Sequence, residues 1–229
     1  MIRHLLQLIW NQRKQNAWLW AELLLVSVFL WFLVDYLYVM GRTYTAPLGF
    51  DIRHTYSIVI SSLSERSPDY IPKEKRERPD GVHLLTALDR IRTYPGVESA
   101  CLTDGGMPYY MGSRNLVWRI DTLQVPCRYA FVTPEFFDVF RIYDKDGKTA
   151  SLKRAIEDNN SIVISADVET MNPGLSLLGQ KAYRGNVTDE IEETIRGISV
   201  PIRRHEYTKA EPNVYRALRL SRMEEEYYE

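Results

Sequence analysis

The sequence lacks an excess of charge of either sign, since 29 basic residues almost balance 30 acidic residues among 229 in total. It also lacks a basic stripe with interleaved aromatic residues, so nothing indicates a nucleic-acid partner. Histidine is scarce, and the four residues are scattered without the spacing of metal ligands. They are His4, His54, His83 and His205. We therefore expect no nucleic acid and no metal.

Catalytic and nucleotide-binding motifs are absent as well. Residues 174–181 (GLSLLGQK) have glycines at phosphate-loop spacing, but Gln180 stands where a lysine would reach the phosphates. Residues 144–147 (DKDG) resemble part of a calcium loop, but Lys153 occupies the position of the bidentate glutamate. No G-x-S-x-G elbow occurs, and neither cysteine neighbours a candidate base. We expect no catalytic residue, no cofactor and no enzyme activity.

One long apolar run, residues 17–40 (AWLWAELLLVSVFLWFLVDYLYVM), is the strongest signal that the sequence contains. As a helix rising about 1.5 Å per residue it is roughly 36 Å long, enough to cross a bilayer. Its two acids, Glu22 and Asp35, lie near its ends, where the headgroup region makes charge less costly. We interpret them as interfacial charges, with polar contacts to other membrane helices as the alternative. The run predicts a transmembrane helix.

Positive charge favours a cytoplasmic N-terminus, because Arg3, Arg13 and Lys14 precede the run and only Arg42 and Arg53 follow it closely. No small-x-small cleavage site follows the apolar run, which predicts an uncleaved anchor rather than a signal peptide. Everything after residue 40 would then lie outside the cytoplasm.

Residues 1–16 predict a cytoplasmic amphipathic segment, because apolar residues recur there on one helical face. That face consists of Ile2, Leu5, Leu6 and Ile9. The segment would lie along the inner leaflet; a continuation of the membrane helix is the alternative.

Residues 41–229 predict an extracytoplasmic α+β domain. Strands are predicted at 55–61, 97–102, 115–120, 125–132, 161–165, 181–184 and 195–200. Helices are predicted at 82–91, after Thr133-Pro134, and before Asn172-Pro173-Gly174, with a solvated charged linker at 72–80. Phe136, Phe137 and Phe140 are expected in the core. The pattern suggests an α/β lobe (41–140), an inserted small β-rich subdomain (141–194) and a return to the first lobe (195–229).

The two cysteines, Cys101 and Cys127, both lie in predicted strands of the first lobe. Outside the cytoplasm a disulfide can persist, so the pair is a candidate bridge. The alternative is that both are small buried apolar side chains, which is how unpaired cysteine usually behaves.

Several phrases in sequence order resemble the first part of MacB/FtsX-type ABC transporter permeases. Residues 94–99 (YPGVES) resemble the family's turn into a strand, and residues 132–140 (VTPEFFDVF) its strand-to-helix phrase. Residues 161–166 and 178–181 resemble two segments that follow in the family. Residues 196–198 (RGI) and 212–215 (PNVY) resemble two later ones.

This resemblance implies a mechanical role in the inner membrane of a bacterium. In the family, a separate cytoplasmic ABC ATPase drives motions of a permease dimer, and the helices transmit them to the outer domain. The implied partners are that ATPase, a second permease copy or homologue, and membrane lipid. The resemblance names no substrate.

A single span with a flexible hinge at Gly41 would rotate freely instead of pushing, so we expect further spans from elsewhere. The family has three more membrane helices near its C-terminus, and the acidic end, residues 224–229, resembles an interrupted element. We therefore expect the gene product to continue. The alternative function is a single-span sensor or receptor whose outer domain binds a ligand or partner.

Overall fold

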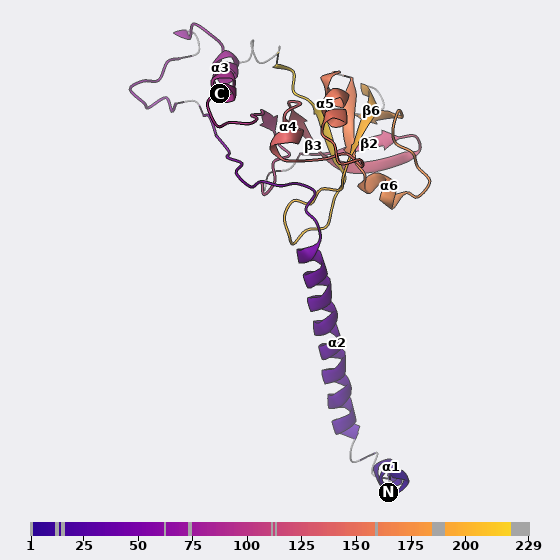
Figure 1. Ribbon diagram of the computed structural model, residues 1–229. Helices are drawn as coiled ribbons and strands as arrows, with labels where there is room; N and C mark the ends of the chain where they lie inside the picture. Colours follow the sequence, from indigo (N-terminus) through magenta and orange to yellow (C-terminus); the bar gives the residue numbers. More distant parts are fainter. Residues whose placement is uncertain are drawn as a thin grey trace. The chain divides into compact units, whose positions relative to one another are not determined.

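The computed structural model describes residues 2–11, 14, 17–61, 63–72, 75–110, 112, 114–158, 160–184 and 191–220. The chain forms two compact units, Met1–Ala46 and Pro47–Glu229, drawn in Figure 1. The first unit is helical, and the second is a mixed α/β domain. The predicted fold class, one N-terminal apolar helix followed by a mixed α/β domain, is confirmed.

The first unit contains α1 (Ile2–Asn11) and α2 (Ala17–Thr45). Lys14 lies in a turn, so the described residues of 1–16 form a separate helix and do not simply continue α2. The side chains of Ile2, Leu5, Leu6 and Ile9 lie outside the described part, and the predicted apolar face stays a prediction.

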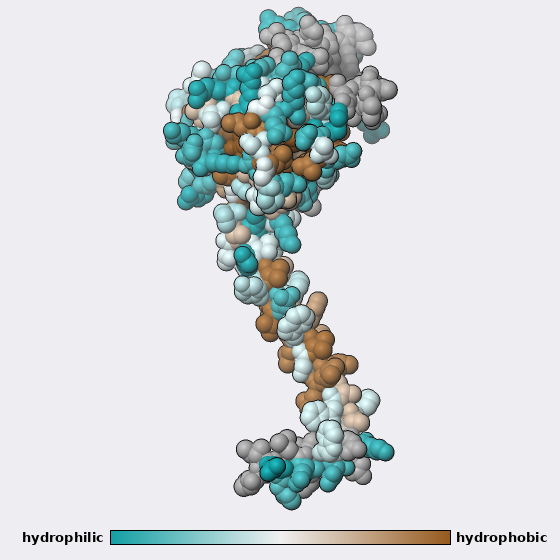
Figure 2. Space-filling model, turned by 90° about the vertical axis from the view of Figure 1, so that its right-hand side faces the viewer, coloured by the Kyte–Doolittle hydropathy of each residue, from teal (hydrophilic) through white to brown (hydrophobic). Residues whose placement is uncertain are grey.

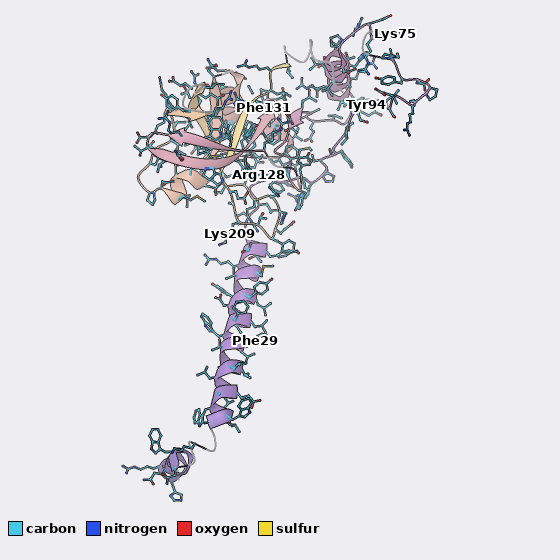
Figure 3. The ribbon with its side chains drawn as sticks, turned by 180° about the vertical axis from the view of Figure 1, so that it is seen from behind. Phe29, Lys75, Tyr94, Arg128, Phe131 and Lys209 are labelled. Atoms are coloured by element: carbon cyan, nitrogen blue, oxygen red, sulfur yellow. The ribbon has the colours of Figure 1, made fainter. Side chains whose placement is uncertain are left out.

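Helix α2 is the one described helix that is long and apolar enough to cross a membrane, and none of its residues is buried. Its apolar side chains, such as Phe29, project from the helix (Figures 2 and 3). The hydroxyl of Ser27 donates to the carbonyl of Leu23 at 2.7 Å, so this polar group is satisfied within the helix. Glu22 and Asp35 lie exposed on α2, and their interpretation stays a prediction.

The described residues of the second unit form seven strands. They are β1 (Thr103–Asp104), β2 (Arg114–Ile120), β3 (Leu123–Val132), β4 (Ser161–Ser165), β5 (Lys181–Arg184), β6 (Ile191–Ser199) and β7 (Asn213–Ala217). Its helices are α3 (Asp80–Arg92), α4 (Phe136–Val139), α5 (Ala150–Glu157) and α6 (Asp167–Met171). Each strand and helix expected from residue 115 onward is present, and so is the helix expected at 82–91.

Six of the strands close into a ring. The order is β3, β2, β5, β6, β4, β7, and β7 then pairs in parallel with β3. The β4–β6 pairing is also parallel, and the other four pairings in the ring are antiparallel. A closed ring of this size is a small barrel, whose interior is just wide enough to be filled by side chains.

Alternation along the strands separates two cores. On β4, Ile162 and Ile164 join a cluster to which all six ring strands contribute, whereas Val163 joins a cluster with α4 and α5. The first cluster is therefore the barrel interior, which includes Trp118 and Cys127. The second, the outer core, lies between the barrel and α4 and α5, and includes the predicted Phe136, Phe137 and Phe140. Figure 1 shows these helices beside the strands.

Two predicted strands are wrong. Residues 55–61 have no regular structure, because composition alone cannot form a strand without a neighbouring strand to bond. Residues 97–102 are not a strand either. Only the two residues that follow them, β1, pair with β3, opposite Val132 and Phe131. Since β3 ends at Val132, residues 97–101 have no strand beside them.

Residues 141–194, suggested as an inserted subdomain, supply β4, β5 and the start of β6. These strands lie in the same ring as β2 and β3, so the described residues of this segment complete the barrel. The barrel contains strands that precede residue 140 in the sequence and strands that follow it, so the sheet is continuous across this position.

Candidate functional site where the chain enters the domain

The first nine residues of the second unit, 47–55, form what we call the entry segment. Hydrogen bonds tie it to the domain along its length: the N–H of Arg203 donates to the carbonyl of Leu48 at 3.0 Å. The N–H of Asp51 donates to the carbonyl of Phe140 at 2.9 Å. The Thr55 hydroxyl donates to the carbonyl of Val139 at 3.3 Å. The entry segment is therefore held at its start, middle and end.

Packing reinforces these bonds. Phe50 packs against the outer core, and its ring meets the ring of Tyr109 edge-on at 5.9 Å between centroids. Gly49 has φ +83°, and a Cβ there would lie 2.1 Å from the carbonyl oxygen of Pro201. Only glycine both adopts this conformation without strain and permits the close approach. The backbone of the entry segment thus lies directly against residues 201–203.

An ionic cluster holds the middle of the entry segment. The Asp51 carboxylate lies 2.7 Å from Nη2 of Arg53 and 3.1 Å from Nη1 of Arg141. Arg141 also donates to the carbonyl of Arg53 at 3.2 Å. The hydrogen bond from the Arg53 side chain, together with one from its N–H, holds the pKa of Asp51 well below its usual range. This cluster is exposed, so its contribution to stability is small, although it fixes the direction of the chain.

Backbone strain concentrates here. Four non-glycine residues in the described part of the chain have positive φ, and three of them, His54 (63°), Tyr109 (61°) and Arg141 (50°), lie in the entry segment or contact it. The fourth, Asp121, lies in the tight turn between β2 and β3. Such conformations persist only where the surrounding structure holds them, and they gather at functional sites. Their position makes the entry segment the leading candidate site.

The loop 201–210 packs against the entry segment on the domain side. Arg203 is buried, and its Nε donates to the carbonyl of Thr208 at 2.7 Å, while its Nη2 contacts the carbonyl of Glu206. The N–H of Tyr109 donates to the carbonyl of Arg204 at 3.2 Å, and its hydroxyl contacts the Glu206 carboxylate. Arg203 therefore holds the loop in the shape that receives Leu48.

The path from α2 to this site is short. Helix α2 continues to Thr45, whose hydroxyl donates to the carbonyl of Gly41 at 3.0 Å. The hinge expected at Gly41 is therefore absent, because Gly41 lies inside the helix. Only Ala46 and Pro47 separate Thr45 from the held Leu48, and proline restricts the chain further. Among its described residues, the entry segment contains no nucleophile hydrogen-bonded to a base.

The predicted pair Cys101 and Cys127 are both free thiols. Cys101 packs against the outer core, whereas Cys127 lies in the barrel interior. Burial raises the pKa of each thiol to about 12, so neither is readily ionised. The structure thus agrees with the alternative interpretation, in which both act as small apolar side chains.

The two segments that resemble a phosphate loop (174–181) and a calcium loop (144–147) have structural roles. The Glu169 carboxylate, which also contacts Lys145, accepts the N–H of Leu177 at 3.1 Å, so one backbone donor of residues 174–181 is already occupied. Asp144 accepts the N–H groups of Asp146 and Lys148 at 2.9 and 2.8 Å and contacts the Ser151 hydroxyl. Burial alone would raise the pKa of Asp144, but these hydrogen bonds lower it. No group of three metal-ligating side chains occurs among the described residues.

The entry segment was not singled out from the sequence as a site. Gly49 two residues after Pro47 is an ordinary turn signal, and no pattern indicates that Pro201 and Arg203 lie against this part of the chain. Only the folded chain brings these segments together.

Known proteins give a second view of the chain. No family model and no curated protein matches the chain. Among solved structures it is similar to a domain of a putative permease protein from Porphyromonas gingivalis, at 20% identity and a TM-score of 0.41. That match covers 56% of this chain and 49% of the other, so the chain spans about half of that structure.

Two further structures are similar at the same level. The periplasmic region of MacB from Actinobacillus actinomycetemcomitans has 10% identity and a TM-score of 0.39, over 58% of this chain and 54% of that one. The extracellular domain of the noncanonic ABC-type transporter YknZ from Gram-positive bacteria has 13% identity and a TM-score of 0.39, over 57% and 59%.

Proposed function

We propose that this chain belongs to a permease subunit of an ABC transporter in a bacterial plasma membrane. Helix α2 spans the membrane with its N-terminus in the cytoplasm, and the barrel domain lies outside. A separate cytoplasmic ATPase supplies the energy, and α2 passes the resulting movement to the domain through the entry segment. The domain binds no cofactor in this role.

The single observation that carries this proposal is the attachment of residues 47–55. A tether that only anchored a domain would be served by a flexible linker, which transmits little force. Here two residues separate the end of α2 from a backbone hydrogen bond at Leu48, and Gly49 lies against Pro201. In this proposal, a displacement of α2 is carried through the two residues after it to Leu48, and through the entry segment to the outer core at Phe140.

An inserted linker tests the proposal. Six Gly/Ser residues placed between Ala46 and Pro47 add a slack segment, and the same six placed between Glu65 and Arg66 serve as the matched control. Both variants are assembled with the ATPase with which the native chain purifies, in vesicles that contain a lipid quencher. A fluorophore on Lys209→Cys, an exposed position labelled in Figure 3, reports the position of the domain relative to the membrane.

The native chain and the control should show a quenching change on addition of ATP, and the 46/47 insertion should abolish that change while the domain melts normally. An unaltered ATP response in the 46/47 variant would contradict coupling through the entry segment. Failure of any ATPase to purify with the native chain would favour the single-span receptor instead.

A further inference from the structure

The stretch that begins at Thr55, the last residue of the entry segment, is exposed where the entry segment is packed. Residues 55–61 (TYSIVIS), which we call the pairing segment, carry no charge, and their apolar side chains are largely exposed. The exposed fractions are 86% for Tyr56, 65% for Ile58, 84% for Val59 and 55% for Ile60. Exposed apolar side chains are ordinary when they stand singly, but a contiguous uncharged run of them indicates a contact surface.

The backbone of this stretch is equally unsatisfied. Within the described part of the chain, residues 56–61 make no backbone hydrogen bond. β-branched and alternating residues prefer a pleated strand with a neighbour on at least one side. The sequence therefore encodes a strand for which the domain supplies no partner.

The ring of six strands has no free edge with which the pairing segment could pair. Each of its six strands has a neighbour on both sides, because β7 closes the ring on β3. A barrel without long edges has little room for an added strand. The six ring strands therefore offer no free edge, and the two-residue strand β1 is too short to pair with the whole stretch, which favours a partner strand from another chain.

The pairing segment is complementary to itself. When two copies run antiparallel and centre on Ile58, Ile58 faces Ile58 and Tyr56 faces Ile60, so one face of the pair is entirely apolar. On the other face Ser57 lies opposite Val59, and Thr55 opposite Ser61. Aromatic and β-branched residues placed opposite each other in this way stabilise an antiparallel pair.

Two physical arguments favour a second copy over the lipid surface as the occupant. A non-helical segment that entered the hydrocarbon would leave its N–H and C=O groups without partners, at several kcal/mol for each group. Two chains held by α2 in one membrane also meet at a high effective concentration, so even a short pairing contact forms readily.

We propose that the pairing segments of two copies of this chain form an antiparallel two-stranded contact centred on Ile58. The inference deepens the proposed function by naming the surface through which two permease copies meet. It also stands without the permease role, because it concerns only how two copies pair.

Cysteine cross-linking of the full chain in membranes reads out the register. At the centre of the pair the two Ile58 Cα atoms should lie about 4.5–5.5 Å apart, within the range that a disulfide spans. Ile58→Cys should thus give a disulfide-linked dimer on mild oxidation. Tyr56→Cys and Ile60→Cys should give none when expressed singly, and a dimer when the two variants are expressed together. The unsubstituted chain measures the background from Cys101 and Cys127.

The outcomes separate the alternatives. Absence of a dimer from Ile58→Cys in a chain whose domain melts normally would overturn the proposal. Dimers of equal yield from all three single variants would overturn it too, since they would show random collision. Quenching of a fluorophore on Ile58→Cys by lipid-borne quenchers, without cross-linking, would identify the membrane as the occupant instead. The test uses no ATPase and no substrate, so its failure leaves the coupling role of α2 untouched.

Discussion

Helix α2 and the barrel interior are built from the same kinds of apolar residue, but every residue of α2 is unburied, whereas Trp118, Ile164 and Ile195 in the barrel are fully buried. The barrel strands hide apolar side chains from water by turning them toward one another. The helix displays them in all directions, a pattern typical of helices that lipid surrounds. The same composition thus serves two solvents, and the following substitutions separate them.

The largest effect is expected in the barrel. Trp118→Ala should reduce the free energy of unfolding of the domain by about 3–5 kcal/mol, because a large buried side chain leaves a cavity. Trp118→Phe should cost less, since the indole Nε1 has no hydrogen-bond partner among the described residues. The matched control Phe29→Ala lies on α2 and should leave denaturant unfolding of the domain unchanged. Equal effects at the two positions would erase the distinction between the two regions.

A charge introduced into α2 should affect membrane insertion and leave the stability of the domain unchanged. Phe29→Arg places a guanidinium near the middle of α2 and should raise the apparent free energy of membrane insertion by about 3 kcal/mol. Trp18→Arg, near the start of α2, should have a much smaller effect. Glycosylation-mapped insertion measures both, and the melting temperature of the domain should not change in either variant. Similar insertion of the two variants would show that α2 does not span the bilayer.

The junction between the two regions should show an intermediate effect. Gly49→Ala should destabilise the domain by about 1–3 kcal/mol, because alanine at positive φ is strained and its Cβ meets Pro201. Gly147→Ala is the control for strain alone, since Gly147 has φ +75° but a Cβ added there would have no neighbour within 4 Å. Chemical denaturation compares the two, and an equal loss of stability would show that contact with Pro201 is unimportant.

The smallest effect concerns Asp51. Its pKa is lowered in the folded state, chiefly by the hydrogen bond from Arg53, so its stabilising effect is present above the pKa of the unfolded chain, near 4. It is lost as the pH falls below that value. Asp51→Asn should slightly lower the melting temperature at pH 7 and leave it unchanged at strongly acidic pH. Asp146→Asn, at an exposed turn, should change neither, and an identical response of both variants would contradict the ionic cluster.

The sequence predicts the parts of this molecule that local patterns encode. The apolar run of α2, the alternation of β3 and the three phenylalanines near α4 each carry their own signal, and each is confirmed. The strand predicted at 55–61 fails because a strand depends on a neighbour, which no local pattern reveals.

Ring closure and the entry segment could not be predicted for a related reason. The pairing of β3 with β7 joins residues about 85 positions apart, such as Tyr129 and Val214. The contact of Gly49 with Pro201 spans an even longer separation. Nothing near Gly49 distinguishes a glycine required by a distant carbonyl from one that only permits a turn.

Closure of the barrel by its last strand also sets an order on synthesis. The chain emerges from its N-terminus, so α2 is complete long before β7, which ends at Ala217. Until β7 has emerged, β3 and β4 each lack a neighbour, and the barrel interior is open to water. The domain therefore stays unfolded while most of its length leaves the ribosome. Late folding follows from the strand order, because the strand that closes the ring is the last to be made.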